Sequence, residues 1–333
     1  MNKKIVSIII IILAIATLVA WKLLPSKKIT NNSNPTIRIA VNPWIGSGLY
    51  YVADEKGFFK DEGLNVTLTD FADGSVGKQL ISTDQVDAIV SLTPETIQVL
   101  NDAGTKVIVS AVFDTSDGAD GIVASAGIQK LSDLNNKTVA YETGSPSHFL
   151  FSYLLDQQGM STKDVKTVNE AAPDAGASFV AGKVDAAVTW EPWLSKAKER
   201  KGGHLIASTK DLNILPGMPI FRASVVQQRP QDIQKFIVAL FKAENYINSS
   251  PNDAYAIIAH RFGIKVSDVT DQLGTFKWLN MQEQKNEFNK NNPNNIYQLI
   301  DKAGNLWLKL GLIKTKVDTA AVLDPSILNS INK

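Results

Sequence analysis

The stretch Val184-Asp185-Ala186-Ala187-Val188-Thr189-Trp190-Glu191-Pro192-Trp193 decides how this chain is organised. It opens as a short apolar run rich in β-branched residues, which is typical of a strand buried on both faces. It then ends in two tryptophans, a carboxylate and a proline. Because a buried strand delivers the residues at its end to the edge of a sheet, the stretch predicts a cleft beside its aromatic end.

A second stretch with the same pattern lies earlier in the chain, from Val86 to Pro94, and the offset between Val86 and Val184 equals that between Pro94 and Pro192. The same offset carries three further residues onto matching types: Val41 onto Val139, Gly46 onto Gly144, and Ser47 onto Ser145. This agreement predicts a duplicated unit. The alternative is two unrelated βα units that use the same strand chemistry. In both cases the chain contains two similar α/β lobes.

The composition is that of an ordinary globular protein with room for two domains, since the chain has 333 residues, 44% of them hydrophobic. The 34 basic and 33 acidic residues leave a net charge of +1, so the balance does not favour nucleic acid as a partner. There is no cysteine, which excludes disulfides, thiolate zinc sites, cysteine nucleophiles and a lipid-modified N-terminal cysteine.

Residues 1–28 predict an N-terminal signal or anchor segment. Lys3 and Lys4 precede an apolar run from Ile5 to Trp21. The run is long for a signal core and barely long enough to cross a bilayer, so an uncleaved anchor and a cleaved signal both remain open. We expect residues 29–35 to be a polar tether. The globular part is then expected outside the cytoplasm, at the cell surface or in the periplasm, exported or tethered by residues 5–24.

Strands alternate with helical patterns from residue 36 onward, which indicates βαβ units and mainly parallel sheets flanked by helices. Lobe 1 is predicted to end in a strand over 106–113. Residues 114–121 have turn chemistry without an apolar pattern and are interpreted as the first crossover. We predict lobe 1 over 36–113, lobe 2 over 114–217, and a return to lobe 1 with C-terminal helices over 218–333. Two crossovers make a hinge, with the cleft at the carboxyl ends of the strands.

Two Gly-Ser pairs lie between a strand and a helix, Gly46-Ser47 and Gly144-Ser145. Such loops expose backbone N–H groups and a hydroxyl at a helix N-terminus, which suits an anionic or acceptor atom. Ordinary capping of the helix by serine is the alternative. His148 follows in the first turn of the second helix, where it could bind a ligand or serve as a cap.

Tryptophans at strand ends are the candidate apolar walls of the cleft. Trp44 and Trp190 are the preferred candidates, because small-molecule clefts combine apolar walls with a few polar groups. Trp193 is the weaker candidate, since it could face the helices of its own lobe.

Acidic residues are numerous in the loops expected near the cleft, whereas the basic candidates there are Lys78 and Arg222. If several carboxylates reach the cleft, a ligand with an amino, amidine or ring N–H group is favoured. Helix capping and turn formation are the alternative. The candidate ligand-binding carboxylates are Asp114, Asp117, Glu142, Asp174 and Glu191; further acidic residues in these loops are Asp70, Asp73, Glu95, Asp120 and Glu170.

No catalytic set is predicted. His148, His204 and His260 match no metal-ligand spacing, and nothing specifies the acid and oxyanion hole that a Ser-His pair needs. We therefore expect neither a metal nor a cofactor, and no enzymatic activity.

The chain from residue 37 to about 223 resembles the substrate-binding proteins of ABC importers for nitrate, taurine, aliphatic sulfonates and thiamine-type pyrimidines. The resemblance rests on Ala53-Asp54-Glu55-Lys56-Gly57-Phe58-Phe59-Lys60-Asp61-Glu62-Gly63-Leu64 together with residues 118–124 and 182–193. It implies a two-lobed, type II periplasmic-binding-protein-like fold. Ligand positions carried over by the resemblance are Trp44, Ser47, Gly144, Ser145 and Trp190. The chain departs from the family in lacking a lipid-attachment cysteine.

The resemblance implies a receptor that closes on a small solute and delivers it to the ABC permease. We expect this receptor to be a monomer and its solute to be sulfonate- or taurine-like, or amine-bearing if the loop carboxylates reach the cleft. One alternative is a membrane-tethered ligand sensor, which the sequence does not separate from transport. The other is a pyrimidine-forming enzyme on the same fold, which would not need an export segment.

Overall fold

The computed structural model describes residues 35–331 apart from 43, 72–73 and 92–93. Pro35–Lys333 form one compact unit, distinct from Met1–Asn34. The predicted signal or anchor segment lies outside the described residues. Within the described part of the chain, no helix is long and apolar enough to cross a membrane.

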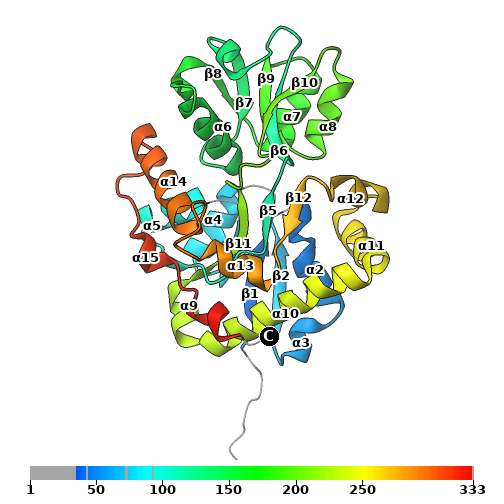
Figure 1. Cartoon of the computed structure of the whole chain (residues 1–333), viewed down its shortest axis with the longest axis vertical. Helices are drawn as coiled ribbons and strands as arrows, with labels where there is room; N and C mark the ends of the chain where they lie inside the picture. Colours follow the sequence, from blue (N-terminus) through cyan, green and yellow to red (C-terminus); the bar gives the residue numbers. More distant parts are fainter. Residues whose placement is uncertain (1–34, 43, 72–73, 92–93, 332–333) are drawn as a thin grey trace, which may run out of the picture. The chain divides into compact units, whose positions relative to one another are not determined.

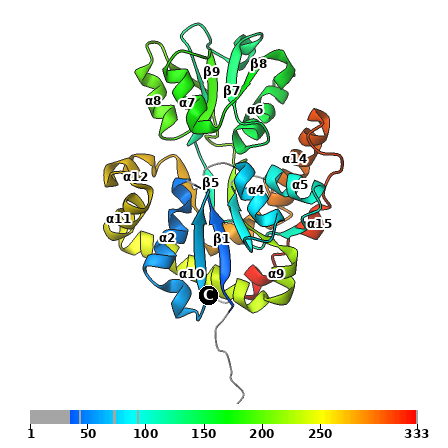
Figure 2. The ribbon, with the colours of Figure 1, turned by 180° about the vertical axis from the view of Figure 1, so that it is seen from behind.

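The larger lobe is built on a sheet of seven described strands in the order β12-β5-β11-β3-β1-β2, with β4 pairing on β11 (Figures 1 and 2). β1 is parallel to β2 and β3, whereas β11 is antiparallel to β3, β4 and β5. The strands are β1 (Ile37–Val41), β2 (Val66–Asp70), β3 (Ala88–Ser91), β4 (Val107–Ile108), β5 (Asp114–Ser116), β11 (Pro216–Arg222) and β12 (Phe276–Trp278).

The smaller lobe has five described strands in the order β10-β6-β9-β7-β8. β7 is parallel to β8 and β9, whereas β6 is antiparallel to β9 and β10. The strands are β6 (Asp120–Ala124), β7 (Thr138–Tyr141), β8 (Lys166–Asn169), β9 (Ala186–Trp190) and β10 (His204–Ser208). The predicted two-lobed α/β fold is confirmed. Its sheets are mixed rather than mainly parallel, because strands that arrive from the other lobe join each parallel trio in the opposite direction.

Helices cover the sheets of both lobes. Several begin with proline in their first turn, as in Pro146, Pro230 and Pro251, where the missing N–H has no helical partner to lose. The larger lobe has η1 (Ile45–Ser47), α2 (Gly48–Glu55), α3 (Phe58–Asp61), α4 (Gly74–Ser82), α5 (Pro94–Asp102), α9 (Ala223–Gln228), α10 (Pro230–Ser249), α11 (Pro251–Phe262), α12 (Val266–Gln272), α13 (Met281–Glu287), α14 (Ile296–Leu310), α15 (Thr319–Val322) and α16 (Ser326–Ser330). The smaller lobe has η2 (Leu131–Leu134), α6 (Pro146–Asp156), η3 (Thr162–Asp164), α7 (Ala172–Val180), α8 (Trp193–Lys196) and η4 (Ala197–Glu199).

The two lobes repeat the same strand pairing. Ile39 lies opposite Ala88 in the larger lobe, and Val139 lies opposite Ala186 in the smaller one. Val139 is therefore the counterpart of Ile39, and the sequence match of Val139 with Val41 is wrong by two residues. The reason is local: four residues separate β1 from Gly46, but only two separate β7 from Gly144.

Residues 114–121, the predicted first crossover, contain strand at both ends. β5 pairs with β11 and β12 in the larger sheet, and β6 begins at Asp120 in the smaller one. The crossover proper is thus only residues 117–119, and β5 lies beyond the predicted end of lobe 1 at residue 113. The predicted strand over 106–113 is reduced to β4, because Val109 makes a bridge with Leu323 instead.

The two connections between the lobes are joined to each other by hydrogen bonds. Thr209, on the returning chain, shares a hydroxyl contact of 2.8 Å with Ser116 and accepts from the Gly118 backbone N–H at 2.9 Å. Its own N–H donates to the Asp120 carbonyl oxygen at 2.9 Å. A pair of connections fastened in this way can bend together, which is the arrangement that hinge motion requires.

A further contact between the lobes is made by α14, which lies beside α6 in both views (Figures 1 and 2). The buried Trp307 ring contacts His148 and Phe149, with ring centroids 5.1 and 5.8 Å apart. Lys309 also forms an ion pair with Asp156 at 2.5 Å. The C-terminal helices therefore limit how the smaller lobe can move.

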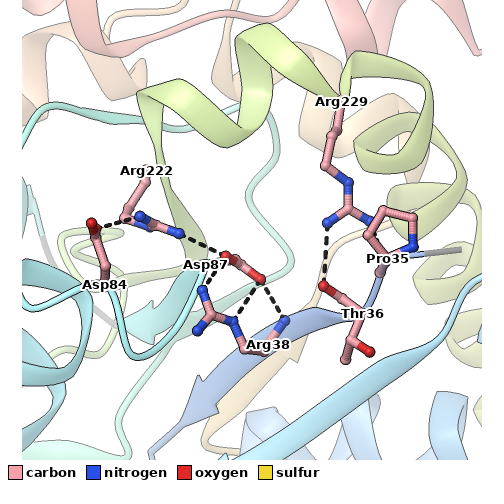
Figure 3. A network of polar contacts seen from close by, with 7 residues as sticks. All are labelled: Pro35, Thr36, Arg38, Asp84, Asp87, Arg222 and Arg229. Carbon is pink, nitrogen blue, oxygen red and sulfur yellow. Dashed lines mark hydrogen bonds and ion pairs between the residues drawn. The ribbon is translucent and has the colours of Figure 1, made fainter.

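The amino ends of β1 and β3 are held by an ion-pair network around Asp87 (Figure 3). The buried Asp87 carboxylate accepts from the Arg38 backbone and guanidinium and, at 2.8 Å, from Arg222 Nη2. Burial raises the pKa of Asp87, but the hydrogen bonds from Arg38 and Arg222 outweigh it and the pKa lies below its ordinary value. Arg222, expected near the cleft, belongs to this network, at the edge of the sheet away from the carboxyl ends of β1 and β3.

Candidate functional site

One cavity lies where the carboxyl ends of β1, β2 and β3 meet those of β7, β8 and β9. Its empty volume is about 680 Å³, including the part that opens to solvent, but the centre of a water molecule fits in only about 50 Å³ of that space. Since one water needs roughly 10–15 Å³ by the second measure, this conformation has room for a few water molecules. The lining residues are Asn42, Trp44, Phe71, Gly74, Lys78, Ile89, Val90, Ser91, Thr96, Glu142, Pro146, Ala171, Pro173 and Trp190.

The two preferred tryptophans both line this cavity, one from each lobe. Trp44 follows β1 and is 3% exposed. Trp190 is half-buried at the end of β9, in register with Asp120 of β6. Trp193, by contrast, packs on its own lobe: a Cβ on Gly176 of α7 would lie 2.6 Å from it, and Lys196 lies over its ring.

Lys78 and Glu142 are the charged side chains among the described residues that line the cavity. Lys78 comes from α4 of the larger lobe and donates to the Gly144 carbonyl oxygen at 2.8 Å. Glu142 comes from the loop after β7. Both approach Gly74, where a Cβ would lie 3.7 Å from Glu142 Oε1 and 3.8 Å from Lys78 Nζ. The cavity thus places one cation and one anion near the same point between the lobes.

The Gly-Ser loops serve mainly to shape the backbone around the cavity. The buried Ser145 hydroxyl donates to the Glu142 carbonyl oxygen at 2.7 Å and accepts from the His148 N–H, as an N-cap does. Ser47 is also buried and donates to Asn42 Oδ1 at 2.7 Å. Asn42 in turn lines the cavity. Both serines therefore act on the cavity through neighbours.

His148 is buried beneath the same loop. Its Nδ1 accepts a hydrogen bond from the Gly144 N–H at 3.0 Å, and burial lowers its pKa to about 4. The imidazole is neutral at neutral pH. Its ring contacts Tyr141 and Trp307, so it supports the Gly144 turn between the lobes and lies outside the cavity lining.

Asp114 and Asp120 are the first residues of β5 and β6, on either side of the crossover, and each is 1% exposed. Burial raises the pKa of Asp114 to about 7, and the charge of Asp120 adds to this, although the Trp44 hydrogen bond lowers it. Burial likewise raises the pKa of Asp120 to about 7, with Glu191 adding. Both Asp120 carboxyl oxygens lack a hydrogen-bond partner among the described residues. The nearby Ser116 hydroxyl lowers the pKa of Asp120, although this hydroxyl makes its hydrogen bond with Thr209.

The remaining candidate carboxylates lie elsewhere. Asp117 forms an ion pair with Lys210 at 2.7 Å, outside this cavity, and the hydrogen bond from Lys210 lowers the pKa of Asp117. Glu191 accepts from the Ser195 N–H and hydroxyl at 3.1 Å, which caps α8. Asp174 is exposed in the first turn of α7. The expectation of a strongly acidic cleft is therefore not what the geometry gives, because these carboxylates serve caps, turns and surface pairs.

Of the other acidic residues, Asp70 binds Tyr51 and Arg261, and Glu170 lies outside the lining. Asp73 and the Glu95 side chain are outside what the structure describes. The cavity residues that sequence reasoning missed follow strand ends or open helices. Thr96, Pro146 and Pro173 lie in the first turns of α5, α6 and α7. A rule that takes every first-turn residue after a parallel strand would have found them.

Within the described residues, no group of three or more His, Asp or Glu side chains is arranged to hold a metal ion. The cavity chemistry is that of a binding site: two indole rings, small hydroxyl and amide groups, and one charge of each sign.

The fold and the position of the cavity define a two-lobed solute-binding architecture. Residues 30–261 match the model of the NMT1-like family, and the chain belongs to this family. A protein of Brucella abortus (strain 2308) that is named as a binding protein is 21% identical over 273 residues, which is 81% of this chain and 84% of that protein.

Solved structures show the same fold. The periplasmic aliphatic sulphonate binding protein SsuA from Escherichia coli superposes with a TM-score of 0.73 at 20% identity, covering 87% of this chain and 92% of that chain. The periplasmic nitrate-binding protein NrtA from Synechocystis PCC 6803 gives a TM-score of 0.72 at 16% identity, covering 89% and 88%.

Proposed function

We propose that this protein is the extracytoplasmic solute-binding component of an ABC importer, and that it captures a small organic solute of the sulfonate or taurine type by closing its lobes. The observation that supports this best is the cavity itself, which equivalent strand-end loops of the two lobes line together. A site built from both lobes binds its ligand most tightly when they are closed, so ligand shifts the protein toward the closed form. The closed form then delivers the solute to the membrane permease.

The chemistry of the lining supports a solute with an anionic end. Four helices, α4 to α7, place first-turn residues on the cavity, namely Gly74, Thr96, Pro146 and Pro173. Helix N-termini favour anions, and Lys78 adds a positive charge beside them. Glu142 offers a place for an ammonium group. A sulfonate that carries an amino group therefore fits the lining better than a simple amine.

The location and partners follow from the same proposal. The two solved structures compared above are of periplasmic proteins, and residues 1–28 have the composition of a signal or anchor segment. A membrane permease is then the partner, and the receptor acts as a monomer.

The test is ligand-induced thermal stabilisation of residues 35–333, using taurine, alkanesulfonates, nitrate, amines, guanidines and aminopyrimidines. A ligand present at about 100 times its Kd adds about 2.7 kcal/mol to the free energy of unfolding, which is easily measured as a shift in Tm. Stabilisation by taurine or an alkanesulfonate is the expected result. Stabilisation by amines or guanidines alone would overturn the sulfonate assignment, and stabilisation by nothing in the panel would overturn this solute class.

A further inference from the structure

The Trp44 ring, one wall of the cavity, is held from behind by a buried carboxyl. Trp44 Nε1 donates to Asp114 Oδ1 at 3.0 Å, and both residues are almost fully buried. Asp114 belongs to β5, the strand that leads directly into the crossover at residues 117–119. This contact therefore joins the ligand wall to the hinge.

The space around the Asp114 carboxyl is shaped by two glycines. A Cβ on Gly217, its partner across the β5–β11 pairing, would lie 2.3 Å from Asp114 Oδ2. A Cβ on Gly46 would lie 2.9 Å from Asp114 Cγ and 2.4 Å from Trp44 Nε1. Any side chain at either position would displace the carboxyl or the indole, so the backbone leaves room for this one arrangement.

β12 supports the same wall from the other side. Trp278 lies opposite Asp114 in the β5–β12 pairing and donates from Nε1 to the Gly46 carbonyl oxygen at 2.8 Å. Phe276 meets the Trp44 ring edge-on, with centroids 5.6 Å apart. The Trp44 loop is thus fixed by a hydrogen bond at its ring and another at its backbone, both from strands beside the hinge.

The groups that face Asp114 come from three elements. Trp44 precedes η1, Tyr50 comes from α2 and has a buried hydroxyl without a partner among the described residues, and Asp120 begins β6. Among all the residues that the structure describes, no ion pair neutralises the charge of Asp114. Glu191 acts one step further away, through Asp120.

We propose that Asp114 is a positioning residue for solute binding, which orients the Trp44 ring from the hinge strand so that the ligand wall is set by the conformation of the crossover. This role rests on the proposed function, because it assumes that the cavity beside Trp44 binds the solute. The indole contact itself exists whichever solute is bound, and can be measured without one.

The protonation of Asp114 gives the contact a signature. An ionised carboxylate is a stronger acceptor for an indole N–H than a neutral carboxylic acid. The pKa of Asp114 is about 7, so the contact strengthens as the pH rises through that value. A residue that only fills space would not give the Trp44 N–H such a titration.

The first experiment follows the indole N–H signals of residues 35–333 by two-dimensional proton–nitrogen NMR, because this part is a compact unit by itself. The signal missing from Trp44→Phe identifies Trp44. In the wild type it should titrate with a midpoint near 7. Asp114→Asn keeps an acceptor oxygen and should keep the N–H protected from exchange while abolishing the titration. Asp114→Leu should lose both.

Asp120→Asn is the matched control. Removing the neighbouring charge should leave the Trp44 titration in place and move its midpoint to lower pH, since Asp120 raises the pKa of Asp114. A Trp44 signal that does not titrate in the wild type, or that stays unchanged in Asp114→Leu, overturns the proposal.

Solute binding provides the second measurement, with taurine and ethanesulfonate as probes in isothermal titration calorimetry. Asp114→Leu should weaken the affinity about tenfold or more, and Asp114→Asn should restore most of it. Equal affinity in wild type and Asp114→Leu overturns the positioning role. If neither probe binds the wild type, the proposed solute class fails, whereas the NMR titration still decides the Asp114 contact.

Discussion

Lys78 in α4 of the larger lobe donates a hydrogen bond from Nζ to the carbonyl oxygen of Gly144 in the smaller lobe, over 2.8 Å. Both residues belong to the cavity region, and the contact crosses from one lobe to the other. Gly144 has a positive φ of 74°, and its own N–H is bound by His148, so its carbonyl oxygen is held in a fixed direction. A side chain that lines the cavity therefore also holds the lobes together.

Lys78→Met should weaken solute binding and favour more open lobes, because it removes both the cation of the cavity and the bond to Gly144. The loss in the free energy of unfolding should stay below about 1 kcal/mol, since the side chain is only partly buried. Small-angle X-ray scattering measures the opening and calorimetry measures the affinity. Lys60→Met, on the exposed surface of α3, is the control and should change neither. Equal scattering and affinity in the two variants would contradict the role of Lys78.

Trp190→Ala should abolish solute binding and shift Tm little, because the half-buried ring lines the cavity. Trp193→Ala should do the opposite. Its ring packs on Gly176 within the smaller lobe, so truncation should lower the free energy of unfolding by about 2 kcal/mol and leave the affinity intact. Thermal melts and titrations of both variants test the pair. A large fall in Tm for Trp190→Ala would show that this ring is part of the core.

Asp87→Asn should destabilise the larger lobe by about 2–4 kcal/mol without changing solute affinity, since it leaves Arg38 and Arg222 without their buried partner. The smaller lobe provides a matched variant. Asp185 Oδ2 accepts from the Thr138 N–H at 2.9 Å, as Asp87 does from the Arg38 N–H, but without an arginine. Asp185→Asn should therefore cost less, about 1 kcal/mol in urea unfolding. A smaller cost for Asp87→Asn than for Asp185→Asn would contradict this account of the network.

The buried Asp120 carboxyl should make the protein less stable as the pH rises from about 4 to 7. Its folded pKa of about 7 lies above the ordinary value of 3.8, so the unfolded chain binds fewer protons across that window. Asp120→Asn removes this cost. Relative to the wild type, its free energy of unfolding should therefore be higher by about 1–4 kcal/mol, with the difference growing as the pH rises from about 4 to 7.5.

His148 acts with the opposite sign, because its folded pKa of about 4 lies below 6.5 and stability is lost as the pH falls through that range. The comparison of variant with wild type at each pH cancels this contribution. Urea unfolding at several pH values gives the difference in the free energy of unfolding. Parallel curves of stability against pH for wild type and Asp120→Asn would show that burial does not penalise the ionised Asp120 carboxylate.

Much of the scaffold could be predicted from local pattern. Val184 to Trp190 predicted a buried strand that ends at a cleft, and β9 ends at Trp190 on the cavity. The C-terminal helices expected over 218–333 include α14 (Ile296–Leu310). These predictions succeeded because apolar periodicity, proline at first turns and glycine at helix ends act within a few residues of each other.

The missed elements depend on distant partners. β5 has the residues of a turn, Asp114 to Ser116, and becomes a strand because β11 and β12 lie on either side of it. β12 and α13 come from the C-terminal third, where the sequence pattern predicts only helices. Strand propensity is weak compared with such pairing, so no local signal could reveal them.

The sequence by itself determined the two α/β lobes, the matching strand ends and the two tryptophans at them, since each follows from hydrophobic spacing and turn chemistry along the chain. Only the tertiary structure decided which polar groups reach the cavity. It selected Lys78 and Glu142, turned Asp117 and Glu191 to surface contacts, and buried Asp114 behind Trp44. The physical reason is that a loop carboxylate can cap a helix, form an ion pair or line a cavity at similar local cost, and only the folded arrangement of the elements around it distinguishes these outcomes.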